Sequence, residues 1–127
     1  MSKTEESKIQ IEVFDWIRGN TASYPALKLI HHYPSSFFGV NYGVVVWLKK
    51  LGWIKGVPGI FIPIARGGFS GLYIEMKTAK GKLSPEQKEF FEMINFYSDI
   101  PYKTETCRRS DEAIRSIKNY LEITEDG

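Results

Sequence analysis

The sequence is poor in the residues that build disulfides and zinc clusters, with a single cysteine, Cys107, and two histidines, His31 and His32. One cysteine cannot form an internal disulfide, and this set cannot supply a four-ligand zinc cluster. The two histidines are adjacent, so on a strand they would face opposite ways and could not bind one metal ion together. We therefore expect them to pack in the core or to contact phosphate, and we expect a reducing cytoplasm as the location.

Long hydrophobic runs are also missing. No apolar stretch approaches the roughly 20 residues that a membrane-spanning helix needs, and no signal peptide opens the chain. The 127 residues are 43% hydrophobic, which is enough for one modest core. These features predict one domain over residues 1–127, with frayed polar ends and no membrane partner.

Acidic residues are absent between Trp16 and Ile74, although the whole chain is nearly balanced, with 17 Lys plus Arg against 15 Asp plus Glu. That span contains both histidines and the basic residues Arg18, Lys28, Lys49, Lys50, Lys55 and Arg66. A block of one sign suits a polyanionic partner such as a nucleic acid. The alternative is a chance cluster of solvated charges.

The most informative stretch runs from residue 71 to residue 87. Its apolar run 72–74 predicts a short strand, which ends in Glu75 and Lys77. Alternate residues of a strand share a face, so this carboxylate and this ammonium should point the same way. Ser84 then opens a helix as its N-cap, and Gln87 completes a capping box.

A carboxylate and a cation on one face suit metal-dependent hydrolysis of a phosphodiester. The carboxylate can hold a hard cation such as Mg²⁺, and the ammonium can orient the attacking water or stabilise charge that develops on the phosphate. The alternative is an ordinary solvated ion pair at the end of a strand. The Glu-x-Lys pattern alone does not distinguish the two.

The remaining elements follow from periodicity and from turn residues. The region 41–51 has helical spacing and ends at Gly52, although its three consecutive valines would also suit a strand. Ser110 should cap the final helix. The expected elements are helix 5–18, strand 27–33, helix 41–51, strand 59–64, a hairpin loop 66–71, a strand from 72, helix 84–97, strand 101–107 and a last helix from 110. This αβαββαβα order predicts an α/β fold with a mixed sheet flanked by helices.

Three segments together resemble one nuclease family. They are Gly56-Val57-Pro58-Gly59-Ile60-Phe61, Gly71-Leu72-Tyr73-Ile74-Glu75-Met76-Lys77 and Gly81-Lys82-Leu83-Ser84-Pro85-Glu86-Gln87, preceded by Glu6, Ile9 and Gln10 in the first helix. In order and spacing they are similar to the virus-type replication-repair nuclease (VRR-NUC) family of the PD-(D/E)xK superfamily. The resemblance covers nearly the whole chain and implies a restriction-endonuclease-like fold.

The resemblance also implies roles for individual residues. Glu75, the backbone carbonyl of Met76 and the first-helix Glu6 would hold Mg²⁺ or Mn²⁺, with Glu5 as the alternative to Glu6. Lys77 would contact the attacking water or the phosphate, and Gln87 would support the site while keeping its capping role. The basic residues expected to contact DNA are Lys80, Lys82, Arg66 and Lys55.

The sequence departs from the family pattern at Gly59. The family reads Gly-x-Pro-Asp, and its aspartate is a metal ligand, so this chain should be impaired or inactive. The glycine is either an inactivating substitution or the mark of a natural protein that kept binding and lost catalysis. A lesser departure is Pro34-Ser35-Ser36, where family members often carry Pro-Asn-Gly.

Small stand-alone members of the family resemble enzymes that resolve Holliday junctions. The resemblance therefore implies an endonuclease for branched DNA that acts as a homodimer in the cytoplasm, as a protein of a phage or of its bacterial host cell. A surface cluster of aromatic residues could form the dimer interface: Phe37, Phe38, Tyr42, Trp47 and Trp53. The alternatives are a DNA-binding module without catalysis and a protein-interaction domain on the same fold.

Overall fold

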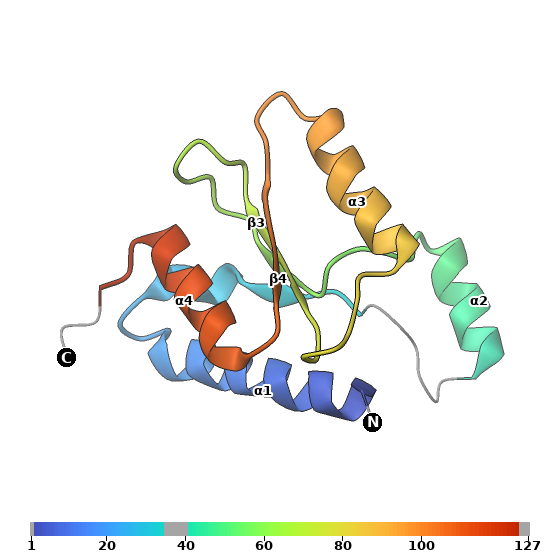
Figure 1. Cartoon of the computed structure of the whole chain (residues 1–127), viewed down its shortest axis with the longest axis horizontal. Helices are drawn as coiled ribbons and strands as arrows, with labels where there is room; N and C mark the ends of the chain where they lie inside the picture. The colour runs from blue at the N-terminus through green and yellow to red at the C-terminus, as the bar shows by residue number, and fades with distance from the viewer. Residues whose placement is uncertain (1, 35–40, 125–127) are drawn as a thin grey trace.

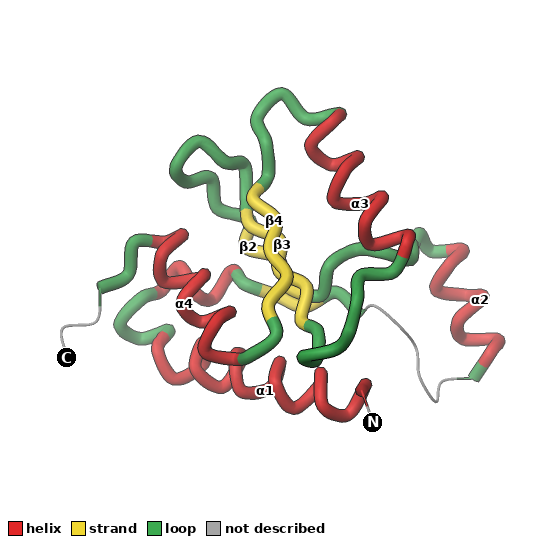
Figure 2. Tube along the Cα trace, viewed as in Figure 1, coloured by secondary structure: helices red, strands yellow, loops and turns green. Residues whose placement is uncertain are grey.

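The computed structural model describes residues 2–34 and 41–124 (Figures 1 and 2). Its elements in chain order are α1 (Ser2–Asn20), the short 3₁₀ helix η1 (Pro25–Leu29), β1 (His31–His32), α2 (Tyr42–Lys50), β2 (Ile60–Ile62), β3 (Leu72–Met76), α3 (Pro85–Phe96), β4 (Lys103–Cys107) and α4 (Ser110–Leu121). Apart from the 3₁₀ helix, this is the predicted αβαββαβα order, and the predicted mixed α/β sheet is confirmed.

The four strands form one sheet in the order β1-β2-β3-β4. β1 pairs with β2 and β2 pairs with β3 in antiparallel fashion, whereas β3 and β4 run parallel. In this register Ile60 lies opposite Ile74, so the residues just before β2 reach the end of β3. The carboxyl end of β3 is therefore enclosed by the start of β2 on one side and by the end of β4 on the other.

The core lies between the sheet and the helix pair α1 and α4, which Figure 1 shows side by side along one face of the sheet. The side chains of β3 alternate between the two faces of the sheet, so its even-numbered and odd-numbered residues pack against different helices. Its even-numbered members are buried in the core cluster with Val13 of α1 and Ile117 of α4. Tyr73 faces the other way, where its ring packs against Phe61 at 4.3 Å and against Phe90 of α3 at 5.3 Å.

Two local predictions, and one of the two alternatives for the histidines, were wrong. The strand expected over 27–33 is only two residues long, because Pro25 starts a 3₁₀ turn that places Leu27 in the core. Of the two alternatives for His31 and His32, packing in the core is wrong because both are exposed, and contact with phosphate stays a prediction. Arg109, not Ser110, is the N-cap of α4, and its side chain makes no capping hydrogen bond.

The region with three consecutive valines is a helix, as its periodicity predicted. Asn41 caps α2 by accepting a hydrogen bond from the backbone N–H of Gly43 at 2.7 Å, and Gly52 follows with a left-handed φ of 114°. None of the residues 42–50, all of which the structure describes, is buried. Within the described part of the chain, no helix is both long and apolar enough to cross a membrane.

The central strand should dominate the stability of the fold. Ile74 is fully buried in β3, so Ile74→Ala should lower the free energy of unfolding by about 2–5 kcal/mol through lost burial and the cavity left behind. The matched control is Ile11→Ala in α1, where the side chain is 56% exposed, and there the change should stay within about 0.5 kcal/mol. Chemical denaturation of both variants measures the difference, and equal losses would contradict this layering.

Candidate functional site

The Glu75 carboxylate is the buried centre of the candidate site. Its residue is only 3% exposed. One oxygen, Oε1, accepts a hydrogen bond from the backbone N–H of Gly59 at 3.0 Å. The other, Oε2, accepts one from Nε2 of Gln87 at 3.1 Å. The start of β2 and the start of α3 therefore both hold this carboxylate at the end of β3.

Lys77 lies on the same face, as the strand alternation predicted. Its Nζ is 3.5 Å from Oε2 of Glu75, and the two side chains are 12% and 4% exposed. Taking two charges out of water costs free energy that their attraction often fails to return. A hydrophobic pair would serve the fold as well, so this ion pair is better explained by chemistry than by stability.

Burial is the main influence on the Glu75 carboxyl, and it raises the pKa above the usual value for glutamate. The ammonium of Lys77 and the backbone N–H of Gly59 act in the opposite direction and favour the charged form. The charge of Glu6 raises the pKa further, which shows that the first helix brings a second carboxylate towards the site. A divalent cation placed here would relieve both the burial cost and the repulsion.

Gln87 forms the predicted capping box and also contacts the Glu75 carboxylate. Its backbone N–H donates to Oγ of Ser84 at 3.1 Å, and its Oε1 accepts from the backbone N–H of Ser84 at 2.8 Å, which completes the capping box. The same amide then uses its N–H₂ group to donate to Glu75. The cap fixes the orientation of the amide, and the amide fixes the carboxylate.

Gly59 is buried, but its backbone does not require glycine. Its φ lies outside the left-handed region, and a Cβ there would meet Oε1 of Gln10 at 3.3 Å and Nδ1 of His32 at 3.7 Å. The first contact involves the end of a flexible side chain and can adjust. At Gly56, by contrast, φ is 100° and a Cβ would lie 2.6 Å from the backbone oxygen of Glu86. Position 59 can therefore accept an aspartate.

Two further side chains border position 59, and neither was predicted to belong to the site. Nδ1 of His32 is 2.8 Å from the carbonyl oxygen of Gly59 and 2.9 Å from Nε2 of Gln10. Gln10 lies one helical turn after Glu6, which is the spacing that puts two residues on one helix face. That spacing was the available signal for Gln10, whereas the position of His32 depends on the pairing of β1 with β2.

The donor set fits a divalent ion that is only partly held by protein. Glu75 is the central carboxylate and Met76 follows it at the end of β3. Glu6 is half-buried while Glu5 is exposed, which favours Glu6 as the first-helix carboxylate. Among the described residues, no group of three or more His, Cys, Asp and Glu side chains gathers into a metal site. Water and substrate phosphate would have to complete the coordination, as they commonly do for Mg²⁺.

A basic turn lies beside this carboxylate. Lys80 and Lys82 are exposed on the turn that joins Lys77 to α3. Arg108, which was not among the predicted site residues, holds this turn in place. Its Nη1 donates to the carbonyl oxygens of Thr78 at 2.7 Å and Gly81 at 2.6 Å. The guanidinium therefore fixes the backbone that carries both lysines.

The other two basic residues predicted to contact DNA are not part of this cluster. Arg66 lies in the hairpin loop between β2 and β3, at the opposite end of these strands from Glu75, where Nη1 donates to the carbonyl of Leu121 at 3.5 Å. Lys55 is closer to the start of α3 and pairs with Glu86, Nζ to Oε1, at 3.8 Å. Neither Arg66 nor Lys55 therefore pairs with the buried Glu75 carboxylate.

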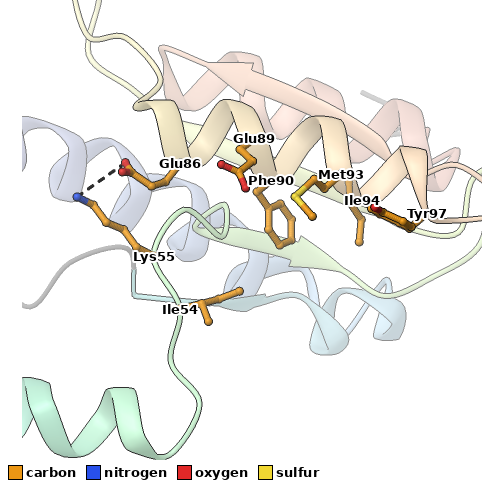
Figure 3. A pocket seen from close by; sticks show the side chains of 8 residues that line it. All are labelled: Ile54, Lys55, Glu86, Glu89, Phe90, Met93, Ile94 and Tyr97. Carbon is orange, nitrogen blue, oxygen red and sulfur yellow. Dashed lines mark ion pairs between the residues drawn. The ribbon is translucent and has the colours of Figure 1, made fainter.

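A groove with a volume of about 390 Å³ lies between the segment before β2 and one face of α3 (Figure 3). Its floor is mostly apolar and includes Ile54, Phe90 and Met93, while the Lys55–Glu86 ion pair closes one end. The Lys55–Glu86 pair in this lining is largely exposed, unlike the buried pair of Glu75 and Lys77. The groove is therefore a surface feature beside the candidate site.

No family model matches the sequence, and no curated protein matches it. Among solved structures, a chain described as "VRR_NUC domain protein" is similar, with a TM-score of 0.72 and 29% sequence identity. The match covers 94% of this chain and 90% of that chain. Because the likeness extends over nearly all of both chains, this protein has the restriction-endonuclease-like fold of the VRR-NUC domain proteins, a nuclease-domain family, and the resemblance carried by its sequence motifs is confirmed.

Proposed function

We propose that this protein is a metal-dependent DNA endonuclease whose activity is weakened by Gly59. The observation that carries the proposal is the buried Glu75 carboxylate, paired with Lys77 on one face of β3 and held by Gln87. A buried carboxylate with a raised pKa and a specific charged partner is typical of functional sites. The similarity to a VRR_NUC domain protein supports nuclease chemistry at this site.

The side chains divide the work. Glu75, with Glu6 and the carbonyl of Met76, would hold Mg²⁺ or Mn²⁺, which supplies a polarised water and neutralises charge on the phosphate. Lys77 is free to turn from Glu75 to the water or phosphate once a cation takes over the carboxylate. Gln87 keeps the carboxylate oriented. Lys80 and Lys82 would bind neighbouring phosphates of DNA.

A non-catalytic DNA-binding module is the second candidate. Gly59 favours it, because an ion at this site has one carboxylate fewer than the family pattern provides. The retained Glu75, Lys77 and Gln87 favour the first candidate, since a module that only binds DNA has no need for a buried ion pair. Both candidates require DNA binding that weakens as salt rises, and a protein-interaction domain does not.

The substrate class and the assembly belong to the same proposal. A four-way junction has two-fold symmetry, so its resolution requires two nicks, and a C₂ dimer supplies two copies of the site. The exposed side of α2 could form the interface, because Tyr42 is 80% exposed and Trp47 is 60% exposed. Trp53 is instead half-buried, stacking on Tyr33 and donating its indole N–H to the carbonyl of Pro34. Phe37 and Phe38 lie outside the described residues.

Gly59→Asp should convert a weak enzyme into an active one. The present chain should nick four-way junctions slowly or not at all with Mg²⁺ or Mn²⁺. Restoring a carboxylate next to Glu75 should raise the rate by about a hundredfold or more, because one added charged ligand stabilises the ion and the developing phosphate charge. Single-turnover nicking assays measure both rates. Robust cleavage that the substitution leaves unchanged would remove position 59 from the site.

Glu75 and Lys77 should separate metal binding from catalysis in the Gly59→Asp background. Glu75→Ala should abolish both metal binding and cleavage. Lys77→Ala should abolish cleavage without lowering the metal affinity, because Lys77 acts on the water or phosphate and does not hold the ion. Calorimetric titration with Mn²⁺ measures the affinity, and Lys80→Ala serves as the exposed control that keeps both properties. Equal loss of metal affinity in the Glu75 and Lys77 variants would refute this division.

The protein should form a homodimer that binds a four-way junction more tightly than linear duplex of the same length. Trp47→Glu places a charge on the exposed side of α2, so it should shift the mass in light scattering towards the monomer. Ile100→Glu, at an exposed position outside α2, should leave the mass unchanged. A monomer at micromolar concentration, with equal affinities for junction and duplex at fixed salt, would exclude this assembly.

A further inference from the structure

Arg108 comes directly after β4 and lies beside the basic turn that joins β3 to α3. Its backbone N–H donates to Oε1 of Glu112 at 3.0 Å, so α4 holds the residue by its main chain. The carbonyl of the preceding Cys107 accepts from the backbone N–H of Lys77 at 2.9 Å, which extends the pairing of β4 with β3 as far as that lysine. The half-buried side chain of Arg108 therefore starts next to the chain that leaves Lys77.

One nitrogen of the guanidinium gathers three carbonyl groups of this turn. Nη1 donates to the carbonyl oxygens of Thr78 at 2.7 Å, Ala79 at 3.3 Å and Gly81 at 2.6 Å. Hydrogen bonds from a charged donor are stronger than those between neutral groups. The turn also closes on itself, because the N–H of Gly81 donates to the carbonyl of Thr78 at 3.1 Å. Arg108 therefore sets the direction in which the backbone of the turn faces.

The orientation of these carbonyls decides what the turn presents to solvent. In a planar trans peptide the C=O and the N–H point in opposite directions. Because the three carbonyls point towards the guanidinium, the N–H groups of Ala79, Lys80 and Lys82 point away from it. The same three residues are exposed. The outer side of the turn thus carries N–H donors and two ammonium groups, while the carbonyl oxygens, which would repel an anion, are held on the inner side.

We propose that Arg108 is a positioning residue that makes the turn 78–82 a binding site for phosphates of the DNA backbone. The inference rests on the proposed function, in which Lys80 and Lys82 contact phosphates. Oriented backbone N–H groups form anion sites in proteins, and groups that are ordered before binding lose less entropy when they bind. The guanidinium acts through the turn and does not itself contact the phosphate. Because the turn begins one residue after Lys77, it would hold the DNA beside the Glu75–Lys77 pair.

The neighbouring arginine provides the matched control. Arg109 carries the same charge and is exposed. Its Nε donates to Oδ1 of Asp111 at 2.9 Å, so this contact lies at the start of α4 and not in the turn. Removing either arginine lowers the net charge of the protein by the same amount. A difference between the two alanine variants therefore reports the position of the guanidinium and not its charge.

The first test is a mutant cycle of DNA affinity, measured by fluorescence anisotropy with a short linear duplex over a range of salt. Removing both lysines, by Lys80→Ala with Lys82→Ala, should weaken binding by about tenfold and reduce the slope of the salt dependence by about two. Arg108→Ala alone should weaken binding by about fivefold at fixed salt, and Arg109→Ala by less than about twofold. In the variant without both lysines, Arg108→Ala should add less than about twofold, because it acts through them and their turn.

The second test examines the turn without DNA. Trypsin cleaves after lysine, so the bonds that follow Lys80 and Lys82 report how firmly the turn is held. Arg108→Ala should speed cleavage at both bonds by about tenfold, because the turn opens locally. Cleavage after Lys88, which is exposed within α3, should keep its rate, and Arg109→Ala should keep all three rates. Mass spectrometry of the fragments identifies the bonds. Equal acceleration at all three bonds would mean that Arg108 supports the whole fold, which would overturn the inference.

The other failures separate this inference from the proposed function. If the loss of both lysines leaves the DNA affinity unchanged, the phosphate contacts in the proposed function are wrong and the inference fails with them. If the lysines matter but Arg108→Ala has no effect on affinity, the inference is overturned and those contacts stand. Additive losses in the mutant cycle would show that the guanidinium binds phosphate by itself, which also excludes a positioning role.

Discussion

The desolvation of the Glu75 carboxylate is the constraint on which the rest of the candidate site depends. A charged group removed from water needs hydrogen bonds and an opposite charge, or it takes up a proton. Three groups supply these contacts to Glu75: a backbone N–H before β2, the amide of Gln87 at the start of α3, and the ammonium of Lys77. Each contact also positions a group that metal-dependent hydrolysis would use.

The helix cap and the site are coupled through one side chain. In most helices a capping box only satisfies backbone groups at the N-terminus. In α3 the capping glutamine has a remaining N–H₂ group, and that group donates to the buried carboxylate. On the other side of the turn, Arg108 holds the carbonyls of Thr78 and Gly81. The turn between β3 and α3 is therefore fixed at both ends, although its lysines are exposed.

Gly59 has a backbone conformation that does not require glycine, and its backbone contacts the candidate site. Its backbone conformation is one that any residue adopts, so the glycine is not explained by the turn geometry that explains Gly56. Its backbone nevertheless contributes to the site through the N–H that Glu75 accepts and the carbonyl that His32 contacts. Gly59 thus takes part in the candidate site through both groups of its backbone, without a side chain.

The sequence determined the parts of this protein that depend on neighbours within a few residues. The alternation of Glu75 and Lys77, the capping box of α3 and the helical period of α2 are all local, and each was predicted. Local patterns failed where a tertiary contact decided the outcome, as at Pro25–Leu29, where burial of Leu27 favours a 3₁₀ turn over a strand. They also could not place Arg66 at the far end of the hairpin from Glu75.

Only the tertiary structure decided which distant residues share the site. The pairing of β1 with β2 brings His32 to Gly59, and the packing of α1 brings Gln10 to the same point. Gln10 and His32 are 22 positions apart in the chain, and His32 and Gly59 are 27 positions apart. Hydrogen bonds and burial over such separations depend on the register of the sheet and on the packing of the helices against it. The sequence therefore determined the Glu75–Lys77 pattern on one strand, and the fold determined which residues surround it.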